Sequence, residues 1–179
     1  MLLVITCLSF ERADDLLSVT NAGFEGVRDT VLAPPVNWKK NGMDSIVWGT
    51  DEDNKHSGKR SLIIRTPPNA TSPQYCSFNQ RLPIRVLKPT RFVVTAYIKT
   101  ELQAGNIGLW AHARNKWDRK TGFEEVKVNK VRTGWTKYSL SIILDNETSD
   151  LYLGGYIDGR GTVWYDDFVI EQRDEIIAN

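Results

Sequence analysis

The sequence of 179 residues lacks several features by which classes of protein function are commonly recognised. It has two cysteines, Cys7 and Cys76, which do not allow a disulfide framework or a cysteine-based zinc site. No apolar run approaches the roughly 20 residues that a membrane-spanning helix needs, so we expect no membrane span. Neither sign of charge dominates, because 23 Lys and Arg stand against 22 Asp and Glu. Nucleic acid is therefore not expected as a partner, since neutralising phosphates requires a basic excess.

Aromatic residues, in contrast, are plentiful. The chain has six Trp, six Tyr and six Phe, within an otherwise ordinary composition of 41% hydrophobic and 25% charged residues. A chain of this length suits one domain, and such a domain buries roughly 70% of its unfolded surface. The aromatic residues must therefore serve a core, a binding surface or both.

The first ten residues, MLLVITCLSF, are almost entirely apolar and precede an acid-rich cluster. This pattern is typical of the hydrophobic region of a secretory signal, although a basic start is missing and Ala13 is a poor cleavage site. An imperfect gene start or an apolar strand of the domain remain as alternatives. We predict a secreted, extracellular protein with a leader or partial signal over 1–13, a domain over 14–172 and a tail over 173–179.

The body of the chain shows short runs in which apolar and polar residues alternate, with turn clusters between them. A period of two over four to eight residues indicates half-buried strands. The runs lie at 45–48, 61–65, 75–80, 91–99, 109–114, 125–128, 138–144, 151–158 and 162–170. Nine or ten short strands without helices predict an all-β fold, a two-sheet antiparallel β-sandwich of Greek-key or jelly-roll type.

One face of this sandwich is predicted to carry unusual side chains. Trp110, His112 and Arg114 alternate with three apolar residues on one strand. If neighbouring strands follow the same alternation, this side also carries Tyr97, Tyr156 and Asp158. Aromatic rings can stack on the apolar face of a pyranose, and planar polar groups bind its hydroxyls. The pattern therefore predicts a saccharide site.

Two further tryptophans are candidates for this site. Trp48 could form a wall of it, and Trp117, in a charged loop, could cap it. Trp38 is interpreted as packing at the edge of the core. The alternative for every one of these aromatic residues is packing under loops or in a second small core, since large aromatic side chains are more often buried than functional.

A catalytic interpretation finds little support in the sequence. A glycosidase needs two carboxylates that face each other, whereas Asp166 and Asp167 are adjacent on a strand and point to opposite faces. Nucleophile motifs are absent. We therefore expect no enzyme activity. A polysaccharide lyase that uses His112 and Arg114 with Tyr97 or Tyr156 remains as a less favoured alternative.

Acidic residues near the two ends of the domain could form a cation site. The first and last strands of a sandwich are commonly neighbours, which would bring Glu25 near Asp166. Backbone carbonyls from a loop such as 56–60 could complete an oxygen cage for a hard cation. Ordinary turn chemistry with exposed carboxylates is the alternative.

Several short motifs, in their order and spacing from about Leu17 to Glu171, resemble carbohydrate-binding modules. They are Asn-x-Gly-Phe-Glu at 21–25, Trp38, Ser-Gly-Lys-Arg-Ser-Leu at 57–62, Gly-Trp-Thr-Lys-Tyr at 134–138 and Val-Trp-Tyr-Asp-Asp-Phe at 163–168. The sequence is most similar to the jelly-roll modules attached to xylanases and β-glucanases, within the galactose-binding-like fold.

This resemblance implies a non-catalytic module of a larger secreted enzyme, and therefore a catalytic domain as partner. It also implies a structural Ca²⁺, which transfers to Glu25 and Asp166 and less directly to Asp167. The glycan would lie in a concave cleft lined by aromatic residues, for which Trp110, Tyr97 and Tyr156 are the matching positions. We therefore predict a module that binds a β-linked polysaccharide or oligosaccharide without cleaving it. A structural or adhesive sandwich that contacts another protein is the alternative from a different class.

Overall fold

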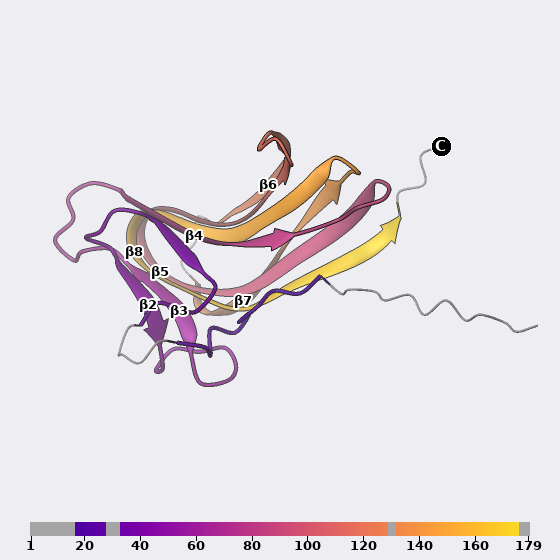
Figure 1. Cartoon of the computed structure of the whole chain (residues 1–179). Helices are drawn as coiled ribbons and strands as arrows, with labels where there is room; N and C mark the ends of the chain where they lie inside the picture. Colours follow the sequence, from indigo (N-terminus) through magenta and orange to yellow (C-terminus); the bar gives the residue numbers. More distant parts are fainter. Residues whose placement is uncertain (1–16, 28–32, 129–131, 176–179) are drawn as a thin grey trace, which may run out of the picture.

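The computed structural model describes residues 17–27, 33–128 and 132–175, which form two layers of antiparallel strands (Figure 1). The described residues contain no helix, and thus none that could cross a membrane. Eight strands follow one another along the chain: β1 (Lys39–Gly42), β2 (Val47–Asp51), β3 (Ser61–Arg65), β4 (Gln74–Pro83), β5 (Thr90–Asn115), β6 (Lys120–Val128), β7 (Arg132–Leu144) and β8 (Thr148–Glu175). The predicted all-β, antiparallel, two-sheet jelly-roll sandwich is confirmed.

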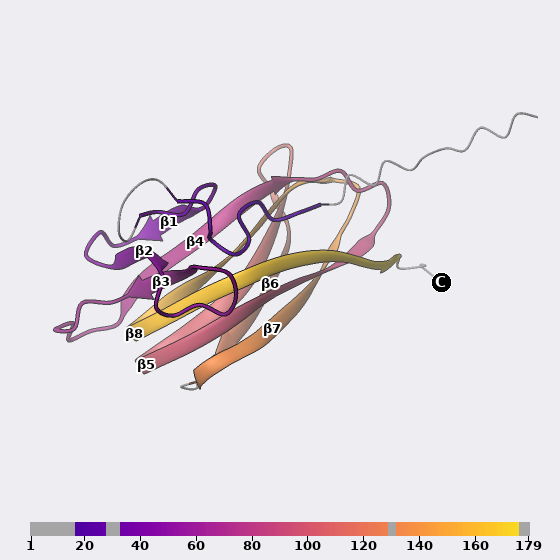
Figure 2. The same cartoon turned by 90° about the horizontal axis from the view of Figure 1, so that it is seen from below.

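Two very long strands, β5 and β8, pass through both layers. The layer that we call the upper layer, as seen in Figure 1, has the order β1, β4, first half of β8, second half of β5, β6. The lower layer has the order β2, β3, second half of β8, first half of β5, β7, and Figure 2 shows it from below. Hydrogen bonding is therefore continuous from one layer to the other.

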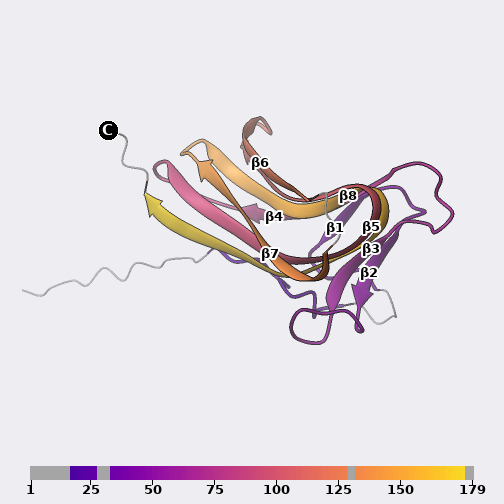
Figure 3. The same ribbon diagram turned by 180° about the vertical axis from the view of Figure 1, so that it is seen from behind.

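The sequence pattern predicted each of these long strands as two short ones. The cluster 158–161 was expected to be a turn, but it lies within β8. Gly105 and Gly161 have φ values of 89° and 136°, and the ladder between the two strands shifts register between Leu102 and Ala104. Glycines and bulges of this kind bend a strand without ending its pairing. Figure 3 shows both strands curving through the sandwich.

The boundaries of the domain differ slightly from the prediction. β8 continues to Glu175, which pairs with Thr90, so the strand extends past the predicted end of the domain at residue 172. The predicted leader over 1–13 lies outside the described residues. Cys76, expected to act as a small buried hydrophobic residue, is fully buried on β4, and burial raises the pKa of its thiol to about 11.

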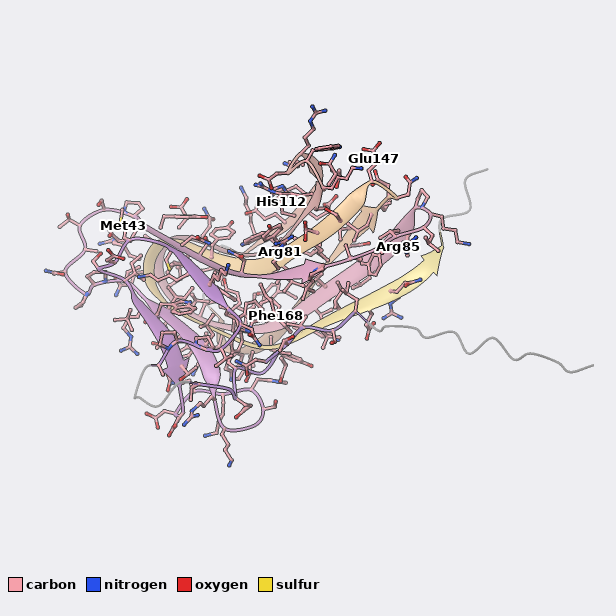
Figure 4. All side chains as sticks on the ribbon, viewed as in Figure 1. Met43, Arg81, Arg85, His112, Glu147 and Phe168 are labelled. Carbon is pink, nitrogen blue, oxygen red and sulfur yellow. The ribbon has the colours of Figure 1, made fainter. Side chains whose placement is uncertain are left out.

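The core lies between the two layers, and aromatic rings gather at one part of it. Trp38 packs against Phe24 and Phe168 with ring centroids 5.1 and 4.9 Å apart, and Phe78 lies 5.4 Å from Trp38. The indole nitrogen of Trp38 donates a hydrogen bond to the carbonyl of Asn21. Figure 4 shows Phe168 between the layers. The interpretation of Trp38 as a packing residue is confirmed.

Tyr165 links the two layers through its hydroxyl group. Its ring is fully buried in the core, and its hydroxyl oxygen accepts the backbone N–H of Tyr156 at 3.1 Å. The carbonyls of Tyr156 and Gly108 lie 2.8 and 2.9 Å from the same oxygen, so either can accept its single proton. Burial raises the pKa of Tyr165 well above its usual range. A side chain of the lower layer thus satisfies backbone groups of the upper layer.

We expect Tyr165→Phe to lower the free energy of unfolding by about 1–3 kcal/mol, because it leaves buried backbone groups without a partner. Urea denaturation measures this change. Tyr138→Phe serves as the control, since Tyr138 also packs against the core but is only partly buried. Equal stabilities of the wild type and Tyr165→Phe would contradict the role of the hydroxyl.

Candidate functional site

The upper layer presents an outward surface, which we call the upper face, made of alternate residues from neighbouring strands. On β5 the inward residues are fully buried, whereas Trp110, His112 and Arg114 point outward and are half-buried. Strand register places four residues side by side in each row across the face. One row is Arg81, Tyr152, His112 and Phe123, and the next is Asn79, Gly154, Trp110 and Glu125.

The row that contains His112 is rich in cations and rings. Arg81 pairs with Asp150 at 2.6 Å, and the guanidinium of Arg114 lies 5.8 Å from the centre of the Tyr152 ring. The His112 ring lies 6.4 Å from Tyr152. Figure 4 shows His112 on the side of the layer toward which β6 curls. Rings and planar donors thus alternate along this part of the face.

His112 has an unusual electrostatic environment. Burial lowers its pKa, and the positive charges of Arg114 and Lys120 lower it further. At neutral pH the imidazole is therefore uncharged and has one N–H donor and one acceptor. Its Nε2 atom is buried and has no hydrogen-bond partner among the described residues. An unpaired buried polar atom costs free energy.

Trp110 lies between a glycine and a carboxylate. Gly154 on β8 and Glu125 on β6 are its cross-strand neighbours. Gly154 allows a close approach of β8 to β4, because an added Cβ there would lie 1.9 Å from the carbonyl oxygen of Phe78. The predicted outward orientation of Trp110 is confirmed by the alternation of burial along β5.

Tyr156 is on the upper face, as predicted, but its ring is not displayed to water. The residue is 8% exposed, and its ring covers Gly108, where an added Cβ would collide with it. Its hydroxyl donates a hydrogen bond to Glu125, and burial followed by this carboxylate raises the pKa of Tyr156. The expectation that Tyr156 is an open stacking platform is therefore wrong.

Tyr75, which stacks on Tyr156, is the exposed ring in this part of the upper face, and the sequence analysis missed it. It is 48% exposed, lies opposite Asp158 on β8 and stacks on Tyr156 with a centroid distance of 6.3 Å. The alternation of Tyr75, Ser77, Asn79 and Arg81 with buried residues on β4 was the available signal. Asp158 is exposed on the same face, as predicted.

Three other predicted residues are not on the upper face. Tyr97 lies in the first half of β5, opposite Lys137 and Asp166, and thus belongs to the lower layer. Trp48 pairs with Ile64 on β3 and packs against the core. Trp117 is in the β5–β6 loop, at one end of the sandwich. The predicted grouping of these residues with Trp110 is therefore wrong.

The loop between β2 and β3 covers part of the outward surface of the lower layer, whereas Arg91 and Ile143 of the same layer are exposed. Trp164 is 2% exposed, its indole nitrogen donates to Asp51 of β2 at 2.7 Å, and the Lys99 ammonium lies 5.0 Å from the centre of its ring. His56 stacks on Tyr97 with ring centroids 3.5 Å apart. Figure 2 shows the loop crossing in front of β8. The aromatic residues of this side thus pack under a loop, which was the alternative weighed for them.

Three carboxylates, Glu25, Asp166 and Asp167, anchor that loop. Asp166 Oδ2 accepts the N–H groups of His56 and Ser57 at 2.8 and 3.2 Å. Burial raises the pKa of Asp166 to about 6, while these two donors act in the opposite direction. Glu25 Oε1 accepts the N–H groups at positions 59 and 60, and Asp167 lies 2.6 Å from the His56 Nδ1 atom.

These three residues are also the predicted calcium ligands. They lie close together, since a Cβ on Gly23 would be within 4.0 Å of all three side chains. However, loop 56–60 turns its N–H groups toward Asp166 and Glu25, where carbonyl oxygens were expected. The described residues contain no group of three or more His, Cys, Asp or Glu side chains placed to hold a metal ion. The arrangement is a carboxylate–amide network, and calcium binding stays a prediction.

Comparison with known proteins identifies the fold. No protein-family model matches the sequence. A curated relative, the uncharacterized HTH-type transcriptional regulator YbfP of Bacillus subtilis, is 22% identical over 133 residues, which are 73% of this chain. The match spans less than half of that protein, namely 45% of its length.

Two solved structures show the same architecture. One is TmCBM61 in complex with β-1,4-galactotriose, with a TM-score of 0.59 and 14% identity over 87% of this chain and 97% of that one. The other is the N-terminal part of endo-1,4-β-D-xylanase 10B of Clostridium thermocellum, complexed with xylohexaose. It has a TM-score of 0.64 and 15% identity, over 88% of this chain and 29% of that one. The chain thus has the β-sandwich fold of carbohydrate-binding modules, as the resemblance in sequence implied.

The packing of Tyr156 on Gly108 can be tested directly. We expect Gly108→Ala to lower the free energy of unfolding by about 1–3 kcal/mol, because the new methyl group overpacks the space under the ring. Gly134→Ala is the matched control, since a Cβ there meets nothing within 4 Å. Urea denaturation compares the two variants, and equal effects would contradict the proposed contact.

The calcium prediction has its own test. A cation that binds only the folded chain stabilises it by mass action. A chelator should then lower the Tm, and added Ca²⁺ should restore it, as followed by circular dichroism. Superimposable melting curves with and without chelator would show instead that the carboxylate–amide network holds the loop unaided.

Proposed function

We propose that this chain is a non-catalytic carbohydrate-binding module that holds a β-linked polysaccharide or oligosaccharide on its upper face. One observation carries the proposal. The upper face displays rings and planar polar groups in rows, whereas on the outward surface of the lower layer His56 of the β2–β3 loop stacks on Tyr97. Such a surface suits a sugar chain, whose rings stack on aromatic side chains and whose hydroxyls need donors and acceptors.

The matched structures support this ligand class. TmCBM61 is in complex with β-1,4-galactotriose, and the xylanase modules are complexed with xylohexaose. Both ligands are neutral oligosaccharides. The structural likeness covers the fold, and the upper face supplies the independent chemical argument for this chain.

The rows suggest how a sugar chain would be held. Trp110 and Tyr75 stack on sugar rings, since both rings face outward on this layer. His112, which is half-buried on the same face, binds a hydroxyl through its imidazole. Arg114 and Asp158 bind further hydroxyls. Tyr156 acts beneath Tyr75 as a support.

Binding without cleavage agrees with the state of the carboxylates and tyrosines on this face. Glu125 accepts the Tyr156 hydroxyl, and Asp150 is paired with Arg81. The lyase alternative needed Tyr97 or Tyr156 beside His112. Tyr97 is on the lower layer, and the Tyr156 hydroxyl is engaged by Glu125, so neither is poised for proton transfer with His112.

We further propose that the module is secreted and works as part of, or beside, an enzyme. The apolar first ten residues support secretion, and the similar portion of the xylanase chain supports an enzyme partner. The curated relative supports a second context, in which such a domain is part of a longer HTH-type transcriptional regulator.

The proposal predicts that Trp110→Ala weakens binding of a neutral β-linked glycan by about tenfold or more, as removal of a central aromatic anchor does at other interfaces. Affinity electrophoresis against a panel of soluble xylans, galactans and β-glucans identifies the ligand, and calorimetry then measures the affinity.

Trp135→Ala is the control, because Trp135 is also half-buried but lies near His56 on the lower layer. The Trp110 variant should keep a near wild-type Tm. Undiminished glycan binding by this variant, or a Tm drop large enough to show that Trp110 is a core residue, would contradict the proposal.

A further inference from the structure

A pocket of about 560 Å³ lies at one end of the sandwich, outside the upper face. Three connections form it: the segment after β4, the β5–β6 loop and the β7–β8 loop. Figure 4 shows Arg85 and Glu147 at this end of the molecule. The last row of the upper face, where Arg114 pairs with Asp150, adjoins the pocket residues Asn115 and Ser149 in the chain.

The charged residues of the pocket are mainly cations. Arg85, Lys116 and Arg119 line it, against the single carboxylate of Glu147. None of the three cations has an ion-pair partner among the residues that the structure describes, whereas Arg81 and Arg114 on the upper face do. Guanidinium groups bind carboxylate or sulfate oxygens in a bidentate manner. The charge of the pocket therefore favours an anionic ligand.

Trp117 gives the same pocket a large ring. This side chain is 70% exposed, which is unusual for a tryptophan in a folded domain. The Lys116 ammonium lies 5.0 Å from the centre of the ring. A flat, exposed ring next to unpaired cations can stack on a sugar while the cations bind a charged substituent of it.

The pocket is built on loops that hydrogen bonds hold in place. Asn115 Oδ1 accepts the N–H groups of Trp117 and Arg119, both at 3.0 Å. In the opposite loop, Asp145 Oδ1 accepts the N–H groups of Glu147 and Thr148 at 3.0 and 3.1 Å. Loops fixed in this way lose little further freedom on binding, which favours affinity.

We propose that this end pocket is a second binding site, specific for a saccharide unit that carries a carboxylate or a sulfate. Trp117 stacks on the sugar ring, and Arg85 and Arg119 bind the anionic group. The inference rests on the proposed function only in its choice of a saccharide, and its residues are distinct from those of the upper face.

The experiment uses the full chain and two anionic probes, trigalacturonate for carboxylate and a heparin-derived tetrasaccharide for sulfate. Neutral galactotriose is the comparison. We expect at least one anionic probe to bind, and its affinity to fall with added salt, because ions screen exposed charge pairs. If only one probe binds, it identifies the anionic group that the site recognises. If both bind, the site accepts a carboxylate as well as a sulfate.

Variants then locate the site. Trp117→Ala and the double variant Arg85→Glu, Arg119→Glu should each weaken the anionic probe by about tenfold or more, as loss of an anchor does elsewhere. Arg91→Glu is the matched control, since Arg91 is an exposed cation on the lower layer. Trp110→Ala should leave binding of the anionic probe unchanged.

The outcomes separate this inference from the proposed function. If neither anionic probe binds at low salt, or if the pocket variants bind like the wild type, the second site is overturned while the upper face is unaffected. If neutral glycans fail to bind but an anionic probe binds through Trp117, the second site holds and the upper-face proposal fails.

Discussion

The strands β5 and β8 pair over nearly their whole length, from Thr90 with Glu175 to Asn115 with Thr148. This ladder begins in the lower layer and ends in the upper one, so it fixes the distance and the angle between the layers. Tyr165 reinforces it, because its hydroxyl satisfies the backbone at Tyr156 and Gly108, where the upper layer begins. Tyr156 and Gly108 also pack against each other on the upper face, where the Tyr156 ring covers Gly108. The pairing of β5 with β8, the longest of the fold, therefore determines the geometry of the upper face.

The two outward surfaces differ because of one loop. The backbone N–H groups of the β2–β3 loop donate to Glu25 and Asp166, and His56 of this loop stacks on Tyr97. Nothing comparable covers the upper face among the described residues, although that face also carries large rings. Exposed rings beside charged side chains are costly to a monomer unless a ligand uses them. The contrast between the faces is therefore the reason to place the function on the upper one.

The sequence was informative about which residues of a strand face outward, and uninformative about the layer to which they belong. Alternation correctly placed Trp110, His112 and Arg114 opposite buried residues. It also grouped Tyr97 with them, since nothing in the pattern shows that β5 changes layer between Tyr97 and Trp110. The glycines of 158–161 were interpreted as part of a turn, whereas Gly161 allows β8 to bend within its ladder.

Tyr156 and Tyr75 show a second limit of the same reasoning. Both point to the upper face, yet one is 8% and the other 48% exposed. The difference arises from Gly108, which lets the Tyr156 ring lie flat, and from Glu125, which holds its hydroxyl. These partners come from two other strands. Outward direction follows from local alternation, but exposure depends on neighbours that only the tertiary structure brings together.

The net charge of the chain likewise does not show which charges lie close together in the structure. A formal net charge of +1 argues against a large basic surface, but it is a sum over the whole chain. Charges act over about one Debye length, roughly 8 Å at physiological ionic strength, so the relevant balance is that of each small region. Three loops that are distant in sequence bring three cations and one carboxylate to the end pocket. A neutral chain can thus hold a locally cationic site, because the fold, and not the composition, decides which charges become neighbours.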